Sequence, residues 1–303
     1  MHFGSSSIVA AVELAVYTPA ITLAFFVCSR HGFSRSSGWY YTFSLCLIRI
    51  IGAVCQLLTL TDHSVGLLEA VLVFNHIGLS SLLLATLGML SRIADWINAE
   101  SSSPSLSIKY FRLTQLCTVL GVVFGIIGIT SSSKSSGDGH TAAARSPSTW
   151  SKIAVICYMV TYAMLVFFMA ISLSFRHQIP GKERLLVPAV CVALPLVFIR
   201  LLYQILVIFV NRGDFKRIDG PVIVLVLMSV VEEFLVILIF LFMGLRLNKL
   251  DESEQGPILS RRRRDRKQRR GRQRKRQGGY EEPFAGYQAP VPMEYIRDRP
   301  AMP

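Results

Sequence analysis

Ionisable side chains interrupt apolar runs that otherwise carry no charge. Arg49 lies in the middle of "LCLIRIIGAVCQLL", and Arg200 lies in the middle of "LVFIRLLYQILVIF". Three acids, Glu13, Glu232 and Glu233, occur in comparable surroundings. A charge in such a run is costly unless it has a partner or faces a polar interior. These residues therefore predict buried ion pairs, a polar binding site, or both.

Polar side chains in the same runs enlarge this set. The candidate ligand-binding or buried polar residues are Glu13, Arg49, Gln56, Asn75, His76, Arg200, Tyr203, Gln204, Glu232 and Glu233. Counting about 1.5 Å per helical residue from the outer end of each run places four residues at one level, roughly 14–18 Å deep: Arg49, His76, Arg200 and Glu232. Glu13 lies about 9 Å deep, within reach of an outward-extended arginine. We therefore expect both arginines to pair with the three acids.

Two interpretations of the buried set stay open. The first is a static salt-bridge network that fixes how the helices pack. The second is a polar pocket, open to the outside, for a small ligand or ion. Two arginines against three acids leave one negative charge in excess, and an unbalanced buried set is more typical of a site. His76 is the only histidine within these runs, and a lone histidine is more typical of a hydrogen-bonded packing residue.

The composition indicates a membrane protein. Of 303 residues, 52% are hydrophobic and 17% are charged, and the mean hydropathy is +0.47; soluble domains carry about a quarter charged residues. Runs of about 20 apolar residues cross a bilayer as helices, because the backbone must satisfy its own hydrogen bonds there. Residues 1–245 therefore predict an all-α, seven-transmembrane-helix bundle. The seven predicted spans are 7–28, 39–61, 67–91, 112–131, 152–175, 185–210 and 221–245.

The distribution of basic residues predicts the orientation. No lysine or arginine precedes the first span. With the N-terminus outside, eight basic residues fall in cytosolic loops and six in outer loops, and sixteen follow residue 245. Because basic residues concentrate on the cytosolic side, we expect N-out, C-in. The first span is too long for a cleaved signal peptide and is predicted to be an uncleaved anchor.

The C-terminal region, 246–303, lacks a hydrophobic period and is predicted to be a disordered, polybasic cytosolic tail. Residues 261–276 hold twelve basic residues and one acid, so they supply +11 of the net charge of +13. The basic residues are Arg261, Arg262, Arg263, Arg264, Arg266, Lys267, Arg269, Arg270, Arg272, Arg274, Lys275 and Arg276. We expect them to contact anionic inner-leaflet lipids, at about 1 kcal/mol per residue near the surface. Arginine-based retention in the endoplasmic reticulum is an alternative, whereas we expect no nucleic-acid partner for a seven-span protein.

Several catalytic and cofactor patterns do not occur. The sequence contains no GxSxG, HExxH or P-loop motif. The last span contains no lysine that could hold retinal, and no CxxC pair or Cys/His spacing suggests a metal site. The six cysteines are predicted to be packing residues. We therefore expect no enzyme activity, no cofactor and no metal.

Two non-enzymatic classes remain. The first class is a protein that binds or translocates a small or amphipathic molecule. A weak internal sequence repeat favours it, because "RH" precedes both "LIRIIGAVCQ" and "FIRLLYQ", and some small-solute carriers are built from repeats. A seven-helix sensory receptor is the alternative. "MLSRI" partly matches the acidic-Arg-Tyr motif of rhodopsin-like receptors but lacks the acid and the tyrosine. In either class the ligand is an unknown small molecule or lipid, and the protein resides in the plasma membrane or the endoplasmic reticulum.

Three segments carry a resemblance to a known family. "RHGFSRSSGW", "LCLIRIIGAVCQL" and "HIGLSSLLLATLGMLSRI" resemble an uncharacterised family of seven-helix membrane proteins from filamentous fungi, over about residues 1–245. Ser81 stands where many members have proline after "IGLS". The resemblance implies the topology and a fungal source, but no activity. At the level of architecture alone, the chain is also similar to lipid-translocating, resistance-associated seven-span proteins of fungi.

Overall fold

The computed structural model describes residues 5–31, 37–59, 61, 64–100, 108–134, 148–175, 183–210 and 230–247. All of them belong to the first of the two units into which the chain divides, residues 1–263. The predicted basic segment 261–276, and nearly all of the tail that contains it, lie outside the described residues. The predictions of disorder and lipid contact for that segment therefore stay predictions.

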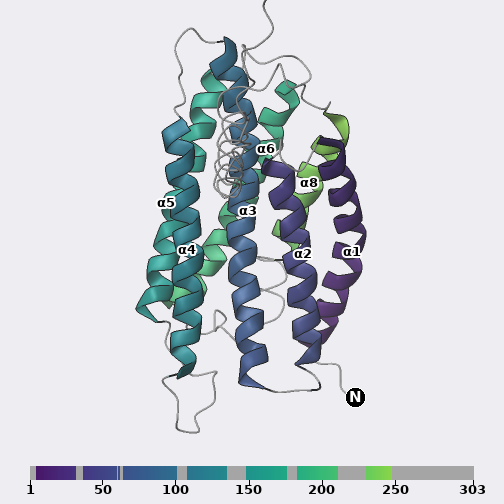
Figure 1. Cartoon of the computed structure of the whole chain (residues 1–303), viewed down its shortest axis with the longest axis vertical. Coiled ribbons are helices and arrows are strands. Elements are labelled where there is room, and N and C mark those ends of the chain that lie inside the picture. The colour runs from purple at the N-terminus through teal and green to yellow at the C-terminus, as the bar shows by residue number, and fades with distance from the viewer. Residues whose placement is uncertain are drawn as a thin grey trace, which may run out of the picture. The chain divides into compact units, whose positions relative to one another are not determined.

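The described part of the chain is helical and contains no strand (Figure 1). Its α-helices are α1 (Ser5–His31), α2 (Ser37–Leu58), α3 (Val65–Glu100), α4 (Ile108–Lys134), α5 (Thr149–Ser174), α6 (Leu186–Ile205) and α8 (Glu232–Arg246). A short 3₁₀ turn, η3 (Glu183–Leu185), leads into α6, and a π-helical segment, η4 (Leu206–Val210), ends it. The prediction of an all-α fold is confirmed.

Six helical segments are long and apolar enough to cross a membrane. They run from Ile8 to His31, Gly38 to Leu58, Gly66 to Asn98, Lys109 to Ser131, Thr149 to Ser174 and Glu183 to Phe209. Each contains most of one predicted span. The seventh predicted span, 221–245, coincides with α8 only from Glu232 onward, and residues 221–229 lie outside the described part of the chain. The seven-span count therefore stays a prediction.

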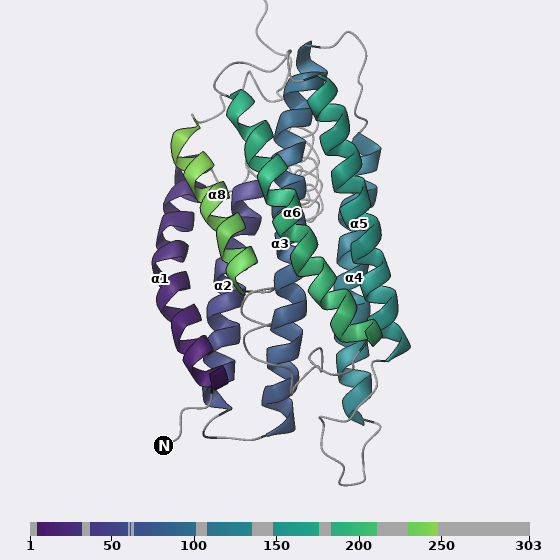
Figure 2. The ribbon, with the colours of Figure 1, turned by 180° about the vertical axis from the view of Figure 1, so that it is seen from behind.

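Helix α3 lies at the centre of this unit (Figures 1 and 2). It contacts α2, α4, α5 and α6, whereas α8 lies against α1, α2 and α6. The sequence accounts for this position, because residues 78–91 are small or apolar on every side and all of them are buried. A helix that is hydrophobic all round belongs in a core rather than at a surface.

Helix α3 is also longer than its predicted span, 67–91. It continues to Glu100, so its 36 residues extend over about 54 Å, more than the roughly 30 Å of a bilayer core. Ala94 and Ile97 are buried, and Arg92 is paired, so the last turns pack like the rest of the helix. The helix also passes through Ser81 without interruption.

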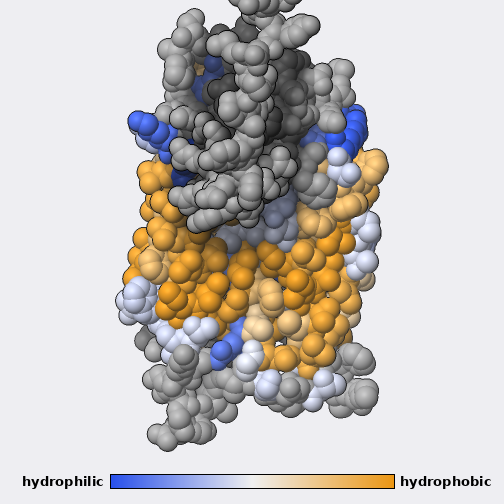
Figure 3. Space-filling view, viewed as in Figure 1, coloured by the Kyte–Doolittle hydropathy of each residue, from blue (hydrophilic) through white to orange (hydrophobic). Residues whose placement is uncertain are grey.

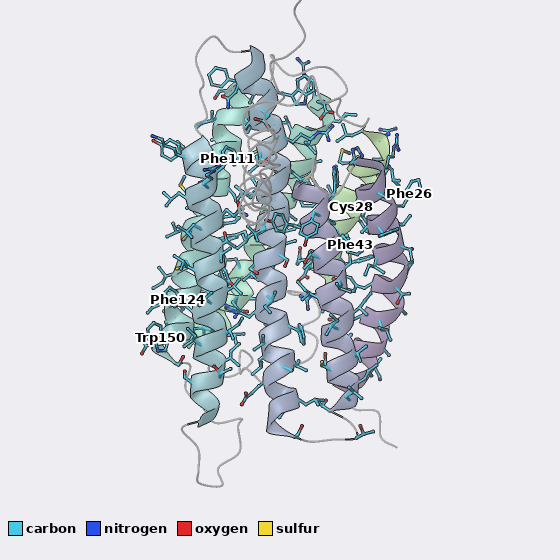
Figure 4. All side chains as sticks on the ribbon, viewed as in Figure 1. Phe26, Cys28, Phe43, Phe111, Phe124 and Trp150 are labelled. Carbon is cyan, nitrogen blue, oxygen red and sulfur yellow. The ribbon has the colours of Figure 1, made fainter. Side chains whose placement is uncertain are left out.

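The face of the bundle that Figure 3 shows carries a wide apolar belt. Side chains such as Phe26 and Leu113 are 58% and 60% exposed on it, and Phe26 lies on the outer side of α1 (Figure 4). Phe111, in contrast, is buried and stacks on Phe168 with 4.4 Å between ring centroids. An exposed apolar surface of this kind fits a lipid environment and not water. The chain is an integral membrane protein by this criterion.

The cysteines behave as predicted for packing residues. All six are free thiols, with Cys28 and Cys46 buried and the other four partly buried. The membrane-spanning region is therefore held together by helix packing and by the polar contacts described next.

Candidate functional site

Glu233 joins two buried arginines from different helices. On α2, Arg49 donates from Nε to Glu233 Oε1 at 2.6 Å and from Nη2 to Oε2, a two-pronged ion pair. On α6, Arg200 donates from Nε to the same Oε2 at 3.4 Å. The side chains of Arg200 and Glu233 are fully buried, and that of Arg49 is 8% exposed. We call these three residues the charge cluster.

Asn75 fixes the orientation of the Arg200 guanidinium. Nη2 of Arg200 donates to the Asn75 side-chain oxygen at 2.7 Å and to its backbone oxygen at 3.3 Å. The guanidinium also lies over the Tyr203 ring, 5.9 Å from its centroid. Nη1 is different: it is buried and has no hydrogen-bond partner among the described residues.

The backbone of α3 borders the charge cluster at Gly78. A Cβ at Gly78 would lie 3.6 Å from both Arg49 Nε and Glu233 Oε1, so a larger side chain would enter the space the ion pair occupies. The hydrogen bond from Arg200 to Asn75 reaches the same helix, one turn earlier. Four helices, α2, α3, α6 and α8, therefore supply the immediate surroundings of the charge cluster.

Helix α1 adds two buried polar side chains nearby. Glu13 is 6% exposed and within electrostatic range of both arginines, but it is hydrogen-bonded to neither. Tyr17, one turn further along α1, is fully buried next to Phe234, with ring centroids 5.8 Å apart. Its hydroxyl has no hydrogen-bond partner among the described residues.

Glu232 is not part of the charge cluster. It is only partly buried, and its Oε2 has no hydrogen-bond partner within the described helices. On a helix, consecutive residues point about 100° apart, so only one of two adjacent acids can face the same neighbours. The sequence alone could not decide between Glu232 and Glu233.

The remaining predicted residues are spread around the cluster. Gln204 lies one turn beyond Arg200 and is 8% exposed, whereas Gln56 is partly buried further along α2. His76 is buried but turns to α4 and α5: its Nε2 lies 3.4 Å from the Gly121 carbonyl oxygen, and its ring lies 5.0 Å from that of Tyr158. His76 therefore packs at another interface.

A further buried ion pair, outside the charge cluster, was not predicted. Arg92 near the end of α3 donates from Nε to Glu183 Oε2 at 3.0 Å and from Nη2 to Oε1 at 2.5 Å. From the sequence, Arg92 was interpreted as the arginine of "MLSRI" and as a basic residue on the cytosolic side, with no partner assigned to it. The pair could have been predicted from the sequence, because Arg92 and Glu183 lie at the same predicted membrane boundary.

At the same end of the bundle, hydrogen bonds connect α1 to α8. His31 Nε2 lies 2.8 Å from the Gly244 carbonyl oxygen, and Arg30 donates to the Leu245 carbonyl oxygen at 3.0 Å. Carbonyl groups in the last turn of a helix lack intrahelical donors and carry partial negative charge, so basic side chains stabilise them.

Among the residues that the structure describes, no group of three or more His, Cys, Asp or Glu side chains could hold a metal ion. The chemistry of the charge cluster is hydrogen bonding and charge pairing in a medium where both are strong.

A family model covers nearly all of the chain. It matches residues 3–250, which include every helix that the structure describes, and it describes a domain of unknown function, DUF7702. The chain belongs to the DUF7702 family. No curated protein and no solved structure matches it. The DUF7702 domain thus contains the charge cluster and the Arg92–Glu183 pair, and the family description assigns no activity to either.

Proposed function

We propose that this DUF7702 protein binds or translocates a small or amphipathic molecule at the charge cluster, within a seven-span bundle. The observation that carries this proposal is Arg200: a fully buried guanidinium, held in place by Glu233 and Asn75, with one nitrogen unpartnered among the described residues. A salt-bridge network that only fixes helix packing gains no stability from an unsatisfied buried donor, which costs about 1–3 kcal/mol. A binding site gains from it, because a ligand can supply the missing acceptor.

The proposal includes the topology. Residues 221–231 are apolar and precede α8, so together they form a seventh segment of spanning length. The N-out, C-in orientation is supported by the sixteen basic residues after residue 245. A fungal source and an architectural likeness to lipid-translocating seven-span proteins belong to the same proposal, supported by the motifs quoted above. The organelle is the plasma membrane or the endoplasmic reticulum, and the protein is not an enzyme.

Binding at the charge cluster is tested with the full chain in nanodiscs of zwitterionic lipid. A panel of small polar solutes and single-chain amphiphiles is screened for an increase in the unfolding temperature, since a ligand that binds the folded state stabilises it. We expect at least one compound to stabilise the wild type and to lose that effect in Arg49→Lys, because lysine keeps the charge but lacks the two-pronged fork. Arg246→Lys is the matched control, since Arg246 is exposed on α8 and lies over Phe242.

The proposal fails if no compound stabilises the wild type, or if Arg49→Lys responds to every compound as the wild type does. Arg246→Lys should respond as the wild type throughout.

A sensory receptor is the second candidate, and the Arg92–Glu183 pair favours it. The pair joins Arg92, about two turns before the end of α3, to Glu183 in the η3 turn that leads into α6, at the predicted cytosolic side. An ion pair between helix ends can have a closed and an open arrangement, which is what a receptor needs to signal across a membrane. Uptake into sealed vesicles separates the classes: a translocating protein accumulates the bound compound, whereas a receptor binds it without accumulation.

The basic tail is proposed to hold anionic lipid. Deleting residues 261–276 removes +11 of charge. We expect the deletion variant to fold as the wild type and to lose most of its preference for nanodiscs that contain anionic lipid. Increasing salt should weaken the wild-type preference, because the attraction is screened within about 10 Å at 0.1 M. Equal preference before and after deletion would remove this role.

A further inference from the structure

We infer that the charge cluster recognises an oxyanion, a carboxylate or a phosphate group, through the free edge of Arg200. This inference rests on the proposed function and names the chemical class of its ligand. It follows from how the three nitrogens of one guanidinium are used.

Two of the three nitrogens are already engaged. Arg200 Nε donates to Glu233 Oε2, and Nη2 donates to the side chain and backbone of Asn75. These contacts come from α8 and α3, so they fix the guanidinium plane from two sides. Nη1, the third nitrogen, carries two N–H donors and has no partner among the described residues, although the side chain is 0% exposed.

The internal acids do not fill this position. Glu233 already accepts hydrogen bonds from Arg49 at both oxygens. Glu13 is within electrostatic range of Arg200 but accepts no hydrogen bond from it, and Oε2 of Glu232 has no hydrogen-bond partner among the described residues. In the hydrogen-bonded group itself, two guanidinium charges face one carboxylate, an excess of one positive charge.

A second buried donor without a hydrogen-bond partner among the described residues, the Tyr17 hydroxyl, lies near the charge cluster. It is within electrostatic range of Arg49, Glu233 and Glu13. A group with several acceptor oxygens could use donors such as these, whereas a cation or an alcohol could not satisfy a guanidinium nitrogen as well. A planar carboxylate and a phosphate are the groups that arginine binds best.

The experiment compares head groups on one apolar chain, using the full protein in nanodiscs of zwitterionic lipid. The probes are dodecanoate, dodecyl phosphate, methyl dodecanoate and dodecyltrimethylammonium, and binding is measured by titration. We expect the two anions to bind and the neutral ester and the cation to bind at least about tenfold more weakly, the size expected for hydrogen bonds to a charged group. This comparison needs no variant, so it holds even where a substitution disturbs folding.

Two variants locate the contact. In Arg200→Lys, which keeps a charge but cannot present a free guanidinium edge, dodecanoate should bind about tenfold or more weakly. In Arg246→Lys, the exposed control, its affinity should be unchanged. Acetate and inorganic phosphate serve as competitors. If acetate or phosphate competes with dodecanoate, a free anion is sufficient for binding. If neither competes, the anion must be carried on an apolar chain. Both results support oxyanion recognition.

Three outcomes overturn the inference. One is equal binding of dodecanoate and methyl dodecanoate. Another is unchanged dodecanoate affinity in Arg200→Lys. The third is binding of no anion at all, in which case water satisfies Nη1. If instead the neutral or cationic amphiphile binds and depends on Arg49, the proposed function stands while the oxyanion inference fails. If no compound of any class binds, the proposed function fails.

Discussion

Replacing Glu233 with alanine is expected to destabilise the bundle more than any other single substitution in the charge cluster. The carboxylate is the shared acceptor of Arg49 and Arg200, so its removal leaves two buried guanidinium groups without their acid. Breaking a buried ion pair from one side costs on the order of 3–5 kcal/mol. The loss is measured as the change in unfolding free energy, by denaturant titration of the purified protein in detergent.

Glu232→Ala is the matched control, because the same change is made one residue earlier. Glu232 is only partly buried and is hydrogen-bonded to neither arginine. We expect its unfolding free energy to change by less than about 1 kcal/mol, as for most surface substitutions. Equal stability of the two variants would contradict the shared-acceptor geometry.

The arginine variants should follow an order set by the same geometry. Arg49→Ala removes both prongs of the pair with Glu233, whereas Arg200→Ala leaves that pair in place. Arg49→Ala should therefore cost more than Arg200→Ala, and Arg49→Lys should lie between Arg49→Ala and the wild type. Removing Arg49 and Glu233 together should recover only part of the loss, because Arg200 then retains Asn75 alone.

Replacing Gly128 with alanine is the second substitution with a large expected effect. A Cβ at Gly128 would lie 2.6 Å from the Ser151 backbone nitrogen and 2.9 Å from Ser148 Oγ. Ser148 caps α5, since its Oγ accepts from the Ser151 amide and donates to the Gly128 carbonyl oxygen at 3.0 Å. A backbone atom cannot rotate away, so α4 and α5 must separate at this end.

The stability of the Gly128 variant is measured in the same denaturant titration. We expect a loss of about 1–3 kcal/mol, the usual range for forcing an extra methyl group into a close-packed contact. Gly66→Ala is the control: no atom lies within 4 Å of a Cβ there, so helix propensity alone should leave it neutral or up to about 1 kcal/mol more stable. If both variants are equally stable, α4 and α5 do not approach as closely as the structure shows.

The sequence determined the class of the protein and three of its buried charges, Arg49, Arg200 and Glu233. Apolar runs of spanning length can only be helices in lipid, so the all-α bundle followed from hydropathy alone. Arginines within such runs require partners, and this requirement by itself pointed to Arg49, Arg200 and the acids. Depth counted along each run also placed these residues at a similar level, because helical rise is uniform.

Only the tertiary structure decided which acid is used. Glu232 and Glu233 are neighbours with the same chemistry, and the rotation of α8 about its axis selects Glu233. That rotation depends on how α8 packs against α1, α2 and α6, which no local pattern encodes. The sequence predicted that both arginines pair with three acids. In the structure both arginines pair with a single acid, Glu233.

The structure also decided what His76 and Arg92 do. Asn75 and His76 are adjacent, yet Asn75 binds Arg200 while His76 packs on Gly121 and Tyr158, because successive residues of α3 face different helices. Arg92 pairs with Glu183, ninety-one residues later in the chain. Contacts between distant segments depend on the order and rotation of whole helices. Hydropathy therefore predicted the six described spans and the burial of Arg49, Arg200 and Glu233, but the pairing came from packing.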